Sequence, residues 1–209
     1  MKTNKFRTNI SFAIIFLCLA LFILLCALQE RGSLKIDTSA VDFVLDLRRG
    51  WLNKIVKLVT HVGSFYVLLV VALLVAIFNK KVGFVSVFGL GVSGVLNFIV
   101  KHIIERPRPD IKLIAETGFS FPSGHAMMSI TLYGFLLYAV IVNINKTWLK
   151  SLLATLLVGM IAVSGLSRVY LGVHYLSDVI AGYALGLAIL VPIIYSFKNL
   201  NFGDFKLKK

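Results

Sequence analysis

Long apolar runs recur along this chain and are separated by short polar segments. Each of six runs is long enough, with its flanking residues, to cross a bilayer as a helix, which takes about 20 residues. They cover residues 10–28, 62–78, 82–100, 126–143, 151–167 and 179–197. Backbone groups in hydrocarbon must be hydrogen-bonded within the protein, and uninterrupted apolarity does not match the alternation of a β-barrel. The pattern therefore predicts six transmembrane helices.

The first apolar run resembles a signal peptide because Lys2, Lys5 and Arg7 precede it. It is longer than the apolar region of a typical signal peptide, and no small-x-small cleavage site clearly follows it. We interpret it as a retained membrane anchor, with cleavage as the alternative.

Residues 30–50 form the most polar long segment. Apolar residues and Arg48 recur there at helical spacing after Asp37, which predicts a short surface helix with Asp37 as its N-cap. From Trp51 to Val59, an apolar face lies opposite Asn53, Lys54 and Lys57. This second pattern fits either a helix resting in the headgroup layer or the flared start of the next span.

Glycines in two of the spans are spaced as in helices that pack closely in membranes. We expect close helix approaches at Gly89, Gly91, Gly94, Gly182 and Gly186.

The composition supports a membrane protein, with 58% hydrophobic and 15% charged residues and a mean hydropathy of +0.90. The net charge of +13 does not indicate nucleic-acid binding, because the basic residues form short clusters between apolar runs. Cys18 and Cys26 lie inside the first span and show no disulfide or metal pattern. We expect an all-α, six-helix membrane bundle with short interfacial helices between its first two spans. It forms a single domain over residues 1–209, with a catalytic core at about residues 97–190.

Six crossings place both termini on one side of the membrane. Eleven of the 22 Lys and Arg residues fall on that side and eleven on the other. Six of the latter are discounted because they belong to the candidate site described below or to the interfacial stretch: Lys54, Lys57, Lys101, Arg106, Arg108 and Arg168. The remaining excess predicts cytoplasmic termini in the cell membrane and a site on the extracytoplasmic face.

His174 and Asp178 open the last span, four residues apart. In a helix that begins at His174, they lie on the same face and can hydrogen-bond. A carboxylate on one ring nitrogen fixes the tautomer and leaves the other nitrogen free to attack an electrophile or take a proton. The alternative is a structural pair at a helix start.

The order of the spans brings further polar residues to the same side of the membrane. Lys101 follows the third span, Ser123, Gly124 and His125 precede the fourth, and Arg168 ends the fifth. Clustered cations beside hydrocarbon are costly unless they bind an anion. Phosphate is a suitable anion, because it accepts bidentate hydrogen bonds from arginine, pairs with the charge of lysine and accepts from the free N–H groups at a helix start. Ser123 can cap this helix or donate its hydroxyl, and Gly124 allows close backbone approach.

Three motifs support this interpretation. Six residues separate Lys101 from Arg108-Pro109, and Pro122-Ser123-Gly124-His125 follows. Five residues then separate Ser167-Arg168 from His174, and three more separate His174 from Asp178. In these motifs the chain resembles the type 2 phosphatidic acid phosphatase (PAP2) superfamily of membrane lipid phosphatases, which shares its site with vanadium haloperoxidases.

The resemblance implies a role for each site residue. His174 would attack phosphorus and carry a phosphohistidine intermediate, Asp178 would orient it, and His125 would protonate the leaving oxygen and later help to activate water. The phosphoryl oxygens would be held by Lys101, Arg108, Ser123, Gly124 and Arg168. Cationic donors can stabilise the transition state in place of a metal, and no Asp, Glu and His cluster has metal-ligand spacing elsewhere. We therefore expect a metal-independent reaction without a cofactor.

Two charged residues between the third and fourth spans are not fixed by these motifs. We interpret Arg106 as a solvated loop arginine, with headgroup contact as the alternative, and Glu116 as either solvating the loop or selecting a headgroup.

The expected function is hydrolysis of a lipid phosphate or diphosphate within the bilayer, on undecaprenyl diphosphate, phosphatidylglycerophosphate or phosphatidate. Tail burial of about 0.8 kcal/mol per methylene favours such amphiphiles. The alternatives are a membrane transporter or binding protein for phosphorylated anions and a lipid phosphotransferase. Nothing in the sequence indicates a nucleic-acid or protein partner.

Overall fold

The computed structural model describes residues 2–29 and 34–197, which contain eight α-helices and one 3-10 helix. In chain order they are α1 Lys2–Gln29, α2 Lys35–Leu47, α3 Gly50–Val59, η1 Thr60–Gly63, α4 Phe65–Phe78, α5 Lys80–Ile104, α6 Gly124–Asn143, α7 Thr147–Tyr170 and α8 Leu176–Phe197. For residues 2–8 only the backbone is described. The basic side chains counted at the two ends of the chain, such as those of Lys2 and Lys209, are therefore outside the described part.

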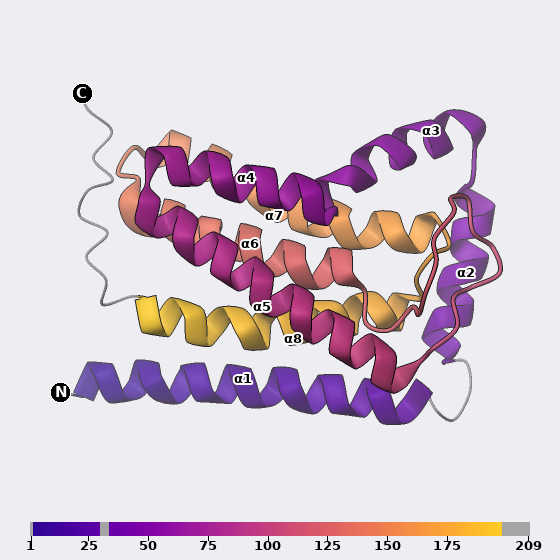
Figure 1. Ribbon diagram of the computed structural model, residues 1–209, viewed down its shortest axis with the longest axis horizontal. Helices are drawn as coiled ribbons and strands as arrows, with labels where there is room; N and C mark the ends of the chain where they lie inside the picture. The colour runs from indigo at the N-terminus through magenta and orange to yellow at the C-terminus, as the bar shows by residue number, and fades with distance from the viewer. Residues whose placement is uncertain (1, 30–33, 198–209) are drawn as a thin grey trace.

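The long helices lie side by side, and α2 crosses one end of the bundle (Figure 1). Five helices are long and apolar enough to span a membrane: α1, α5, α6, α7 and α8. The sixth span is composite, because α3 with η1 and α4 pass the same test together although the chain bends by 50° between them. The all-α fold with five to six spans is confirmed.

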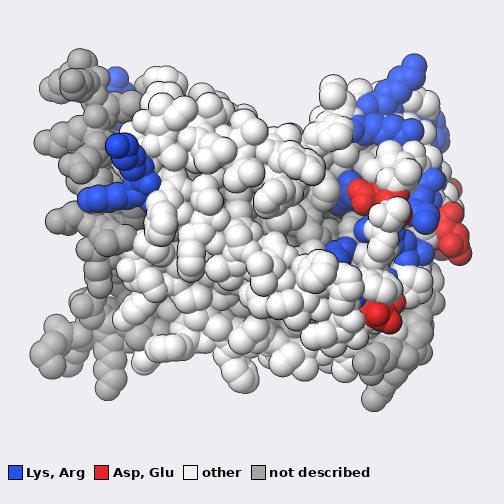
Figure 2. Space-filling view, in the orientation of Figure 1, with Lys and Arg blue, Asp and Glu red and all other residues white. Residues whose placement is uncertain are grey.

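The surface of the bundle matches a bilayer environment. Figure 2 shows a broad uncharged band on the visible face, with Lys and Arg at both ends of the molecule and Asp and Glu at one end. Large apolar side chains such as Phe88, Phe98 and Leu156 are exposed on this bundle. Exposed apolar surface on this scale is stable only against hydrocarbon.

The segment between the first two spans forms two helices, as expected, but Asp37 does not cap the first. Helix α2 begins at Lys35 with Leu34 in the N-cap position, and Asp37 is buried in its first turn. The reason lies in tertiary contacts, since the carboxylate binds groups of α8 and of the chain after α5. A bend of 50° separates α3 from α4, and Trp51, Ile55 and Leu58 of α3 are exposed, which fits both a helix in the headgroup layer and the start of the next span.

The core of the bundle is apolar and joins α4, α5, α6 and α8. Its buried members include Leu68, Val85, Leu132, Phe135 and Leu190. Helices α6 and α8 approach each other closely at two glycines. A Cβ atom at Gly182 would lie 2.6 Å from the backbone oxygen of Ser123, and one at Gly186 would lie 2.6 Å from that of Met127.

The expectation from glycine spacing holds on α8 and only partly on α5. A Cβ at Gly89 would meet Thr131 Cγ2 at 3.2 Å, but one at Gly91 or Gly94 would meet nothing within 4 Å. Those two glycines lie on faces of α5 away from other helices, which spacing alone does not reveal.

We expect Gly186→Ala to destabilise the protein by about 1–3 kcal/mol, because the new methyl group would force backbone apart at the α6–α8 crossing. Gly91→Ala is the matched control and should be neutral or stabilising by about 0.5–1 kcal/mol, since it adds a methyl group in open space within a helix. Thermal unfolding in detergent measures both. Equal unfolding temperatures for the two variants would contradict the close crossing.

Candidate active site

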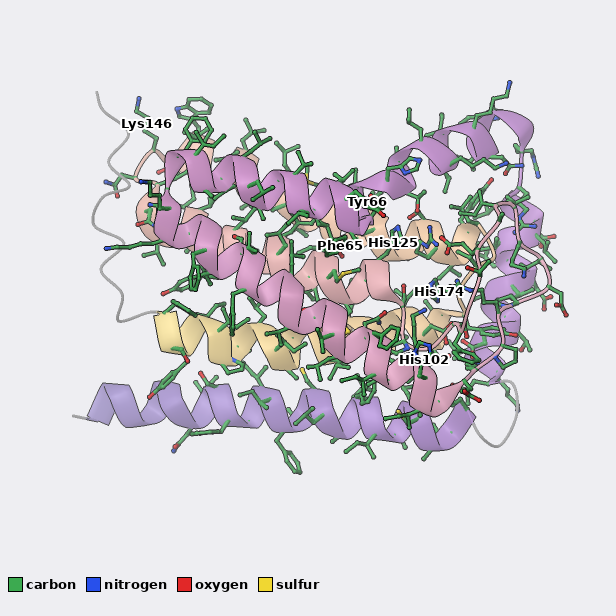
Figure 3. The ribbon with its side chains drawn as sticks, in the orientation of Figure 1. Phe65, Tyr66, His102, His125, Lys146 and His174 are labelled. Atoms are coloured by element: carbon green, nitrogen blue, oxygen red, sulfur yellow. The ribbon has the colours of Figure 1, made fainter. Side chains whose placement is uncertain are left out.

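His174 lies at the end of the bundle that α2 crosses (Figure 3), and Asp178 lies beside it. Helix α7 ends at Tyr170, and a turn through Gly172, with φ of +67°, leads the chain back toward α8. A left-handed residue without a Cβ is needed there, because a Cβ would lie 2.5 Å from the carbonyl oxygen of Ile111. The turn leaves His174 just before α8, whose first turn contains Asp178.

The His174–Asp178 pair has the expected hydrogen bond. Nδ1 of His174 lies 3.3 Å from Oδ2 of Asp178, which also accepts a 2.9 Å bond from the backbone N–H of Tyr175. Both side chains are buried. Since a carboxylate accepts, Nδ1 is the protonated nitrogen and Nε2 has a lone pair in place of a proton.

Arg108 lies against this unprotonated nitrogen. Its Nη1 lies 3.4 Å from Nε2 of His174 and donates a 2.9 Å hydrogen bond to the carbonyl oxygen of Val173. Two further bonds of 3.0 Å, from Nε to Gly118 and from Nη2 to Thr117, fix the plane of the guanidinium group. The arginine is therefore positioned by backbone carbonyls, which leaves its charge directed at His174.

Arg168 and Lys101 complete a cluster of cations from three segments. Arg168 is buried, donates to Thr60 Oγ1 at 3.3 Å and forms an ion pair with Glu116. Its Nε is buried without a hydrogen-bond partner in the described structure. Lys101 donates a 2.5 Å bond to the carbonyl oxygen of Phe119 and lies within electrostatic range of Arg108 and Arg168. Lys101 and Arg108 thus lie near His174, and Arg168 is linked to Arg108 through Glu116.

The start of α6 brings Ser123, Gly124 and His125 to the same place. The backbone N–H of Ser123 donates a 3.0 Å bond to the carbonyl oxygen of Asp178, which ties this helix start to α8. Ser123 stands at the N-cap but makes no capping bond, and its Oγ is buried without a partner in the described chain. Ser123 therefore does not cap α6 with its hydroxyl, contrary to one of the two expectations.

Gly124 and His125 contact different elements, α5 and η1 respectively. A Cβ at Gly124 would lie 3.0 Å from Oδ1 of Asn97, so that only glycine fits without displacing this amide. The ring of His125 packs against η1, where a Cβ at Gly63 would lie 3.1 Å from its Cδ2. His125 lies at the same end of the bundle as His174 (Figure 3) and within electrostatic range of it.

Arg106 is not the solvated loop arginine that the sequence suggested. It is buried, with Nη1 donating to Asp178 Oδ1 at 2.6 Å and Nη2 donating to Asp37 Oδ2 at 2.8 Å. Its guanidinium carbon lies 4.1 Å from the ring centroid of Tyr175, a cation–π contact. The buried guanidinium group is thus paired with two buried carboxylates.

Asp37 and Ser177 extend this buried network and were not identified from the sequence. Asp37 accepts from Ser177 twice, from the backbone N–H at 2.8 Å and from the hydroxyl at 2.7 Å. Ser177 Oγ also receives a 2.7 Å bond from Arg106. Asp37 and Arg106 are 69 positions apart, so no periodicity connects them. The one available signal in the sequence was charge. The segment after the first span contains an acidic residue, and one of the two arginines in Arg-Pro-Arg-Pro needed a partner.

The electrostatics of the loops set the protonation states. Burial lowers the pKa of His174 to about 4; the hydrogen bond and charge of Asp178 oppose this shift, and Lys101 and Arg108 add to it. Burial raises the pKa of Glu116, but the charge and hydrogen bond of Arg168 and the charge of Arg108 outweigh it, so the net shift is downward. At neutral pH the site thus contains a neutral imidazole and an ionised Glu116.

This arrangement suits a tetrahedral oxyanion attacked by nitrogen. A neutral imidazole offers its lone pair beside three cations, a free hydroxyl and the N-terminus of α6. Within residues 2–29 and 34–197, no group of three or more His, Cys, Asp or Glu side chains is placed to hold a metal ion.

We expect Asp37→Asn to destabilise the fold by about 3 kcal/mol, because it leaves a buried guanidinium group with one of its two counter-charges. Asp42→Asn on the exposed face of the same helix is the matched control and should change stability by less than about 0.5 kcal/mol. The free energies of unfolding in detergent give the comparison. Similar values for the two variants would show that the Asp37–Arg106 pair adds no net stability.

The depressed pKa of His174 predicts a pH dependence of stability. The unfolded chain binds this proton near pH 6.5 and the folded chain only near pH 4, so between these values the unfolded state carries more protons. Stability should therefore fall by up to about 3 kcal/mol as the pH drops through this window, relative to His174→Asn. Unfolding midpoints of both proteins from pH 7 to pH 4 test this. The prediction would be contradicted if the stability of the wild type relative to His174→Asn stayed constant, or increased, as the pH falls.

Comparison with known proteins agrees with this geometry. Residues 83–202, more than half of the chain, match the PAP2 superfamily. The chain is 33% identical over 178 residues to phosphatidylglycerophosphatase B of Bacillus subtilis (strain 168), covering 82% of this chain and 88% of that protein. It is 31% identical over 144 residues to an undecaprenyl-diphosphatase of Sulfolobus acidocaldarius, covering 65% and 66%.

A solved structure shows the same fold. The crystal structure of the first transmembrane PAP2 type phosphatidylglycerolphosphate phosphatase from Bacillus subtilis superposes with a TM-score of 0.77 at 28% identity, covering 92% of this chain and 98% of that one. The resemblance indicated by the three motifs is thereby confirmed. The chain belongs to the PAP2 superfamily and is a multi-pass membrane lipid phosphatase of the PAP2 type.

Proposed function

We propose that the chain removes the terminal phosphate of a lipid phosphate or diphosphate through a phosphohistidine formed on His174. The observation that carries this proposal is the arrangement of the imidazole, with Nδ1 on Asp178 at 3.3 Å and Nε2 facing Arg108 at 3.4 Å. A nucleophile needs a free lone pair beside the group that binds its electrophile, and Nε2 is in that position.

In the first step, the Nε2 lone pair forms a bond to phosphorus while the bond from phosphorus to the lipid oxygen breaks. The electron pair of the broken bond stays on the leaving oxygen, which takes a proton from His125. For a monoester the leaving group is a lipid alcohol, and for a diphosphate it is a lipid monophosphate. Asp178 stabilises the positive charge that develops on His174.

In the second step, water attacks phosphorus and the N–P bond breaks, returning the electron pair to Nε2. His125 accepts a proton from this water, so that the acid of the first step serves as the base of the second. The products are inorganic phosphate and the regenerated imidazole. Lys101, Arg108, Ser123, Gly124 and Arg168 hold the phosphoryl oxygens in both steps.

The substrate reaches the site from the bilayer. His174 lies at one end of the bundle and Lys146 at the other (Figure 3), with the uncharged band of Figure 2 between these ends. A phosphate at this boundary can keep its lipid tail in hydrocarbon, where each methylene contributes about 0.8 kcal/mol. With cytoplasmic termini, as the basic residues suggest, the site faces the outside of the cell membrane.

The names of the relatives support two substrate classes, a glycerophospholipid phosphate and a polyprenyl diphosphate. We propose that the natural substrate belongs to one of these classes, both of which end in a phosphate group with three free oxygens.

Phosphate release in detergent tests the proposal. Wild-type protein is expected to release phosphate from at least one of phosphatidylglycerophosphate, phosphatidate and undecaprenyl diphosphate, and orthovanadate should inhibit it as a mimic of the five-coordinate phosphorus. His174→Ala should lower kcat at least about a thousandfold, because it removes the bond-forming atom. His102→Ala, at an exposed histidine at the end of α5, is the matched control and should keep wild-type turnover.

The outcomes separate the parts of the proposal. Full turnover in His174→Ala would exclude this residue as the nucleophile without excluding the phosphatase activity. Transfer of phosphate to an added alcohol without release in water would identify a phosphotransferase.

A further inference from the structure

Helix α3 combines exposed apolar and basic side chains at the catalytic end of the bundle. Trp51, Ile55 and Leu58 are 65%, 49% and 73% exposed and recur at the spacing of one helix face. Lys54 and Lys57 are exposed beside this face, and Lys and Arg side chains gather over α3 in Figure 2. Helix α3 thus presents an apolar stripe, formed by the first three residues, with a basic edge.

The opposite face of α3 is fixed to the protein. Leu52 and Val56 pack against the buried cluster that contains Tyr170 at the end of α7. The side-chain oxygen of Asn53 accepts a 2.7 Å hydrogen bond from the hydroxyl of Tyr170. These contacts set the rotation of α3 about its axis, so the apolar stripe and its basic edge face away from the bundle.

The length of α4 places α3 at the edge of the hydrocarbon layer. Helix α4 runs along the bundle (Figure 1), and its 14 residues rise about 21 Å, about 9 Å less than the hydrocarbon thickness of about 30 Å. After a bend of 50°, η1 and the last turn of α3 cover this remainder obliquely. Lys57 then lies near the boundary and Lys54 in the headgroup layer, where a lysine can extend its charge along an apolar surface.

The charges on α3 favour an anionic partner. Residues 48–59 contain Arg48, Arg49, Lys54 and Lys57 and no acidic residue. Among the described residues, no carboxylate forms an ion pair with either lysine. A partner must offer hydrocarbon to the apolar stripe and negative charge to its basic edge, and a phospholipid with an anionic headgroup offers both.

We propose that the exposed face of α3 binds anionic phospholipids of the bilayer, with their headgroups at Lys54 and Lys57 and their acyl chains against the apolar stripe. This inference goes beyond the proposed reaction and does not depend on it. Because α3 lies against the end of α7 that contains Arg168, such binding gives the catalytic end a local excess of anionic lipid.

The fluorescence of Trp51 reports which lipid lies at α3. The chain has two tryptophans, so Trp148→Phe leaves Trp51 as the single one. This protein is reconstituted into vesicles of equal parts phosphatidylglycerol and phosphatidylcholine, with brominated acyl chains on one lipid or on the other. Random mixing around α3 would quench the fluorescence equally in both preparations. We expect the quenching to give a ratio of phosphatidylglycerol to phosphatidylcholine at Trp51 of at least about three.

Variants in the same background assign the preference to the two lysines. Lys54→Gln combined with Lys57→Gln should bring the ratio close to one, and arginine at both positions should retain it. Lys80→Gln combined with Lys146→Gln is the matched control, because it removes two exposed lysines at the other end of the bundle and should leave the ratio unchanged. Raising the salt from about 0.1 M to about 1 M should lower the wild-type ratio, since the Debye length falls from about 10 Å to about 3 Å.

Three results would overturn the proposal. Equal quenching by the two lipids before the lysines are changed would show that α3 contacts lipid without selecting its charge. A preference that survives the loss of both lysines would assign it to other groups. Absence of quenching by either lipid would mean that protein, such as a second copy of this chain, covers the apolar stripe. None of these outcomes involves phosphate release, so failure of the proposed function would leave the test intact.

Discussion

The buried ion pairs of Arg106 hold the catalytic end of this molecule together. One guanidinium group binds Asp37 of α2 and Asp178 of α8 from the segment that follows α5. Three parts of the chain that are far apart in sequence are joined by charges that cannot be left unpaired away from water. Two carboxylates against one cation leave a negative charge in excess, and the Lys101, Arg108 and Arg168 cluster lies beside it. The network therefore serves both the packing of α2 and the electrostatic balance of the site.

The Arg-Pro-Arg-Pro sequence explains how one short segment serves both members of the His–Asp pair. In extended chain, residues two apart point to the same side, and each proline fixes its own φ and keeps the residue before it extended. Arg106 binds Asp178, while Arg108, two positions on, faces His174. The amide and hydroxyl of Ser120 bind the carbonyl oxygen of Arg106 and fix the segment further. The alternation of arginine and proline thus places one arginine against each member of the His174–Asp178 pair.

Much of this architecture follows from sequence, and the exceptions have a common cause. Spans could be predicted because bilayer thickness fixes helix length, and the convergence of Lys101, Arg168 and His174 followed from the parity of the crossings. The His174–Asp178 bond followed from one helical turn. The contacts of Asp37 with Arg106 and of Glu116 with Arg168 join irregular segments to distant residues, where neither periodicity nor span order applies.

The same reasoning explains the errors on α5. The spacing of Gly91 and Gly94 is compatible with helix contact, but only the tilt and rotation of the neighbouring helices decide which face is covered. Gly182 and Gly186 are covered because α8 must bring Asp178 to the start of α6, where Ser123 donates to its backbone. A site that needs two helix ends within one hydrogen bond of each other sets the distance between the helices that carry them.

The division of the Asp178 oxygens sets the tautomer of His174. Oδ1 is taken by Arg106, and Oδ2 is left for the imidazole and for the backbone N–H of Tyr175. A carboxylate that already accepts from a cation stays ionised, so Nδ1 must keep its proton. Arg108 beside Nε2 disfavours a second proton on the ring, and burial acts in the same direction. In the proposed reaction, burial and the charge of Arg108 thus keep the attacking nitrogen unprotonated, while Asp178 fixes the proton of the ring on Nδ1.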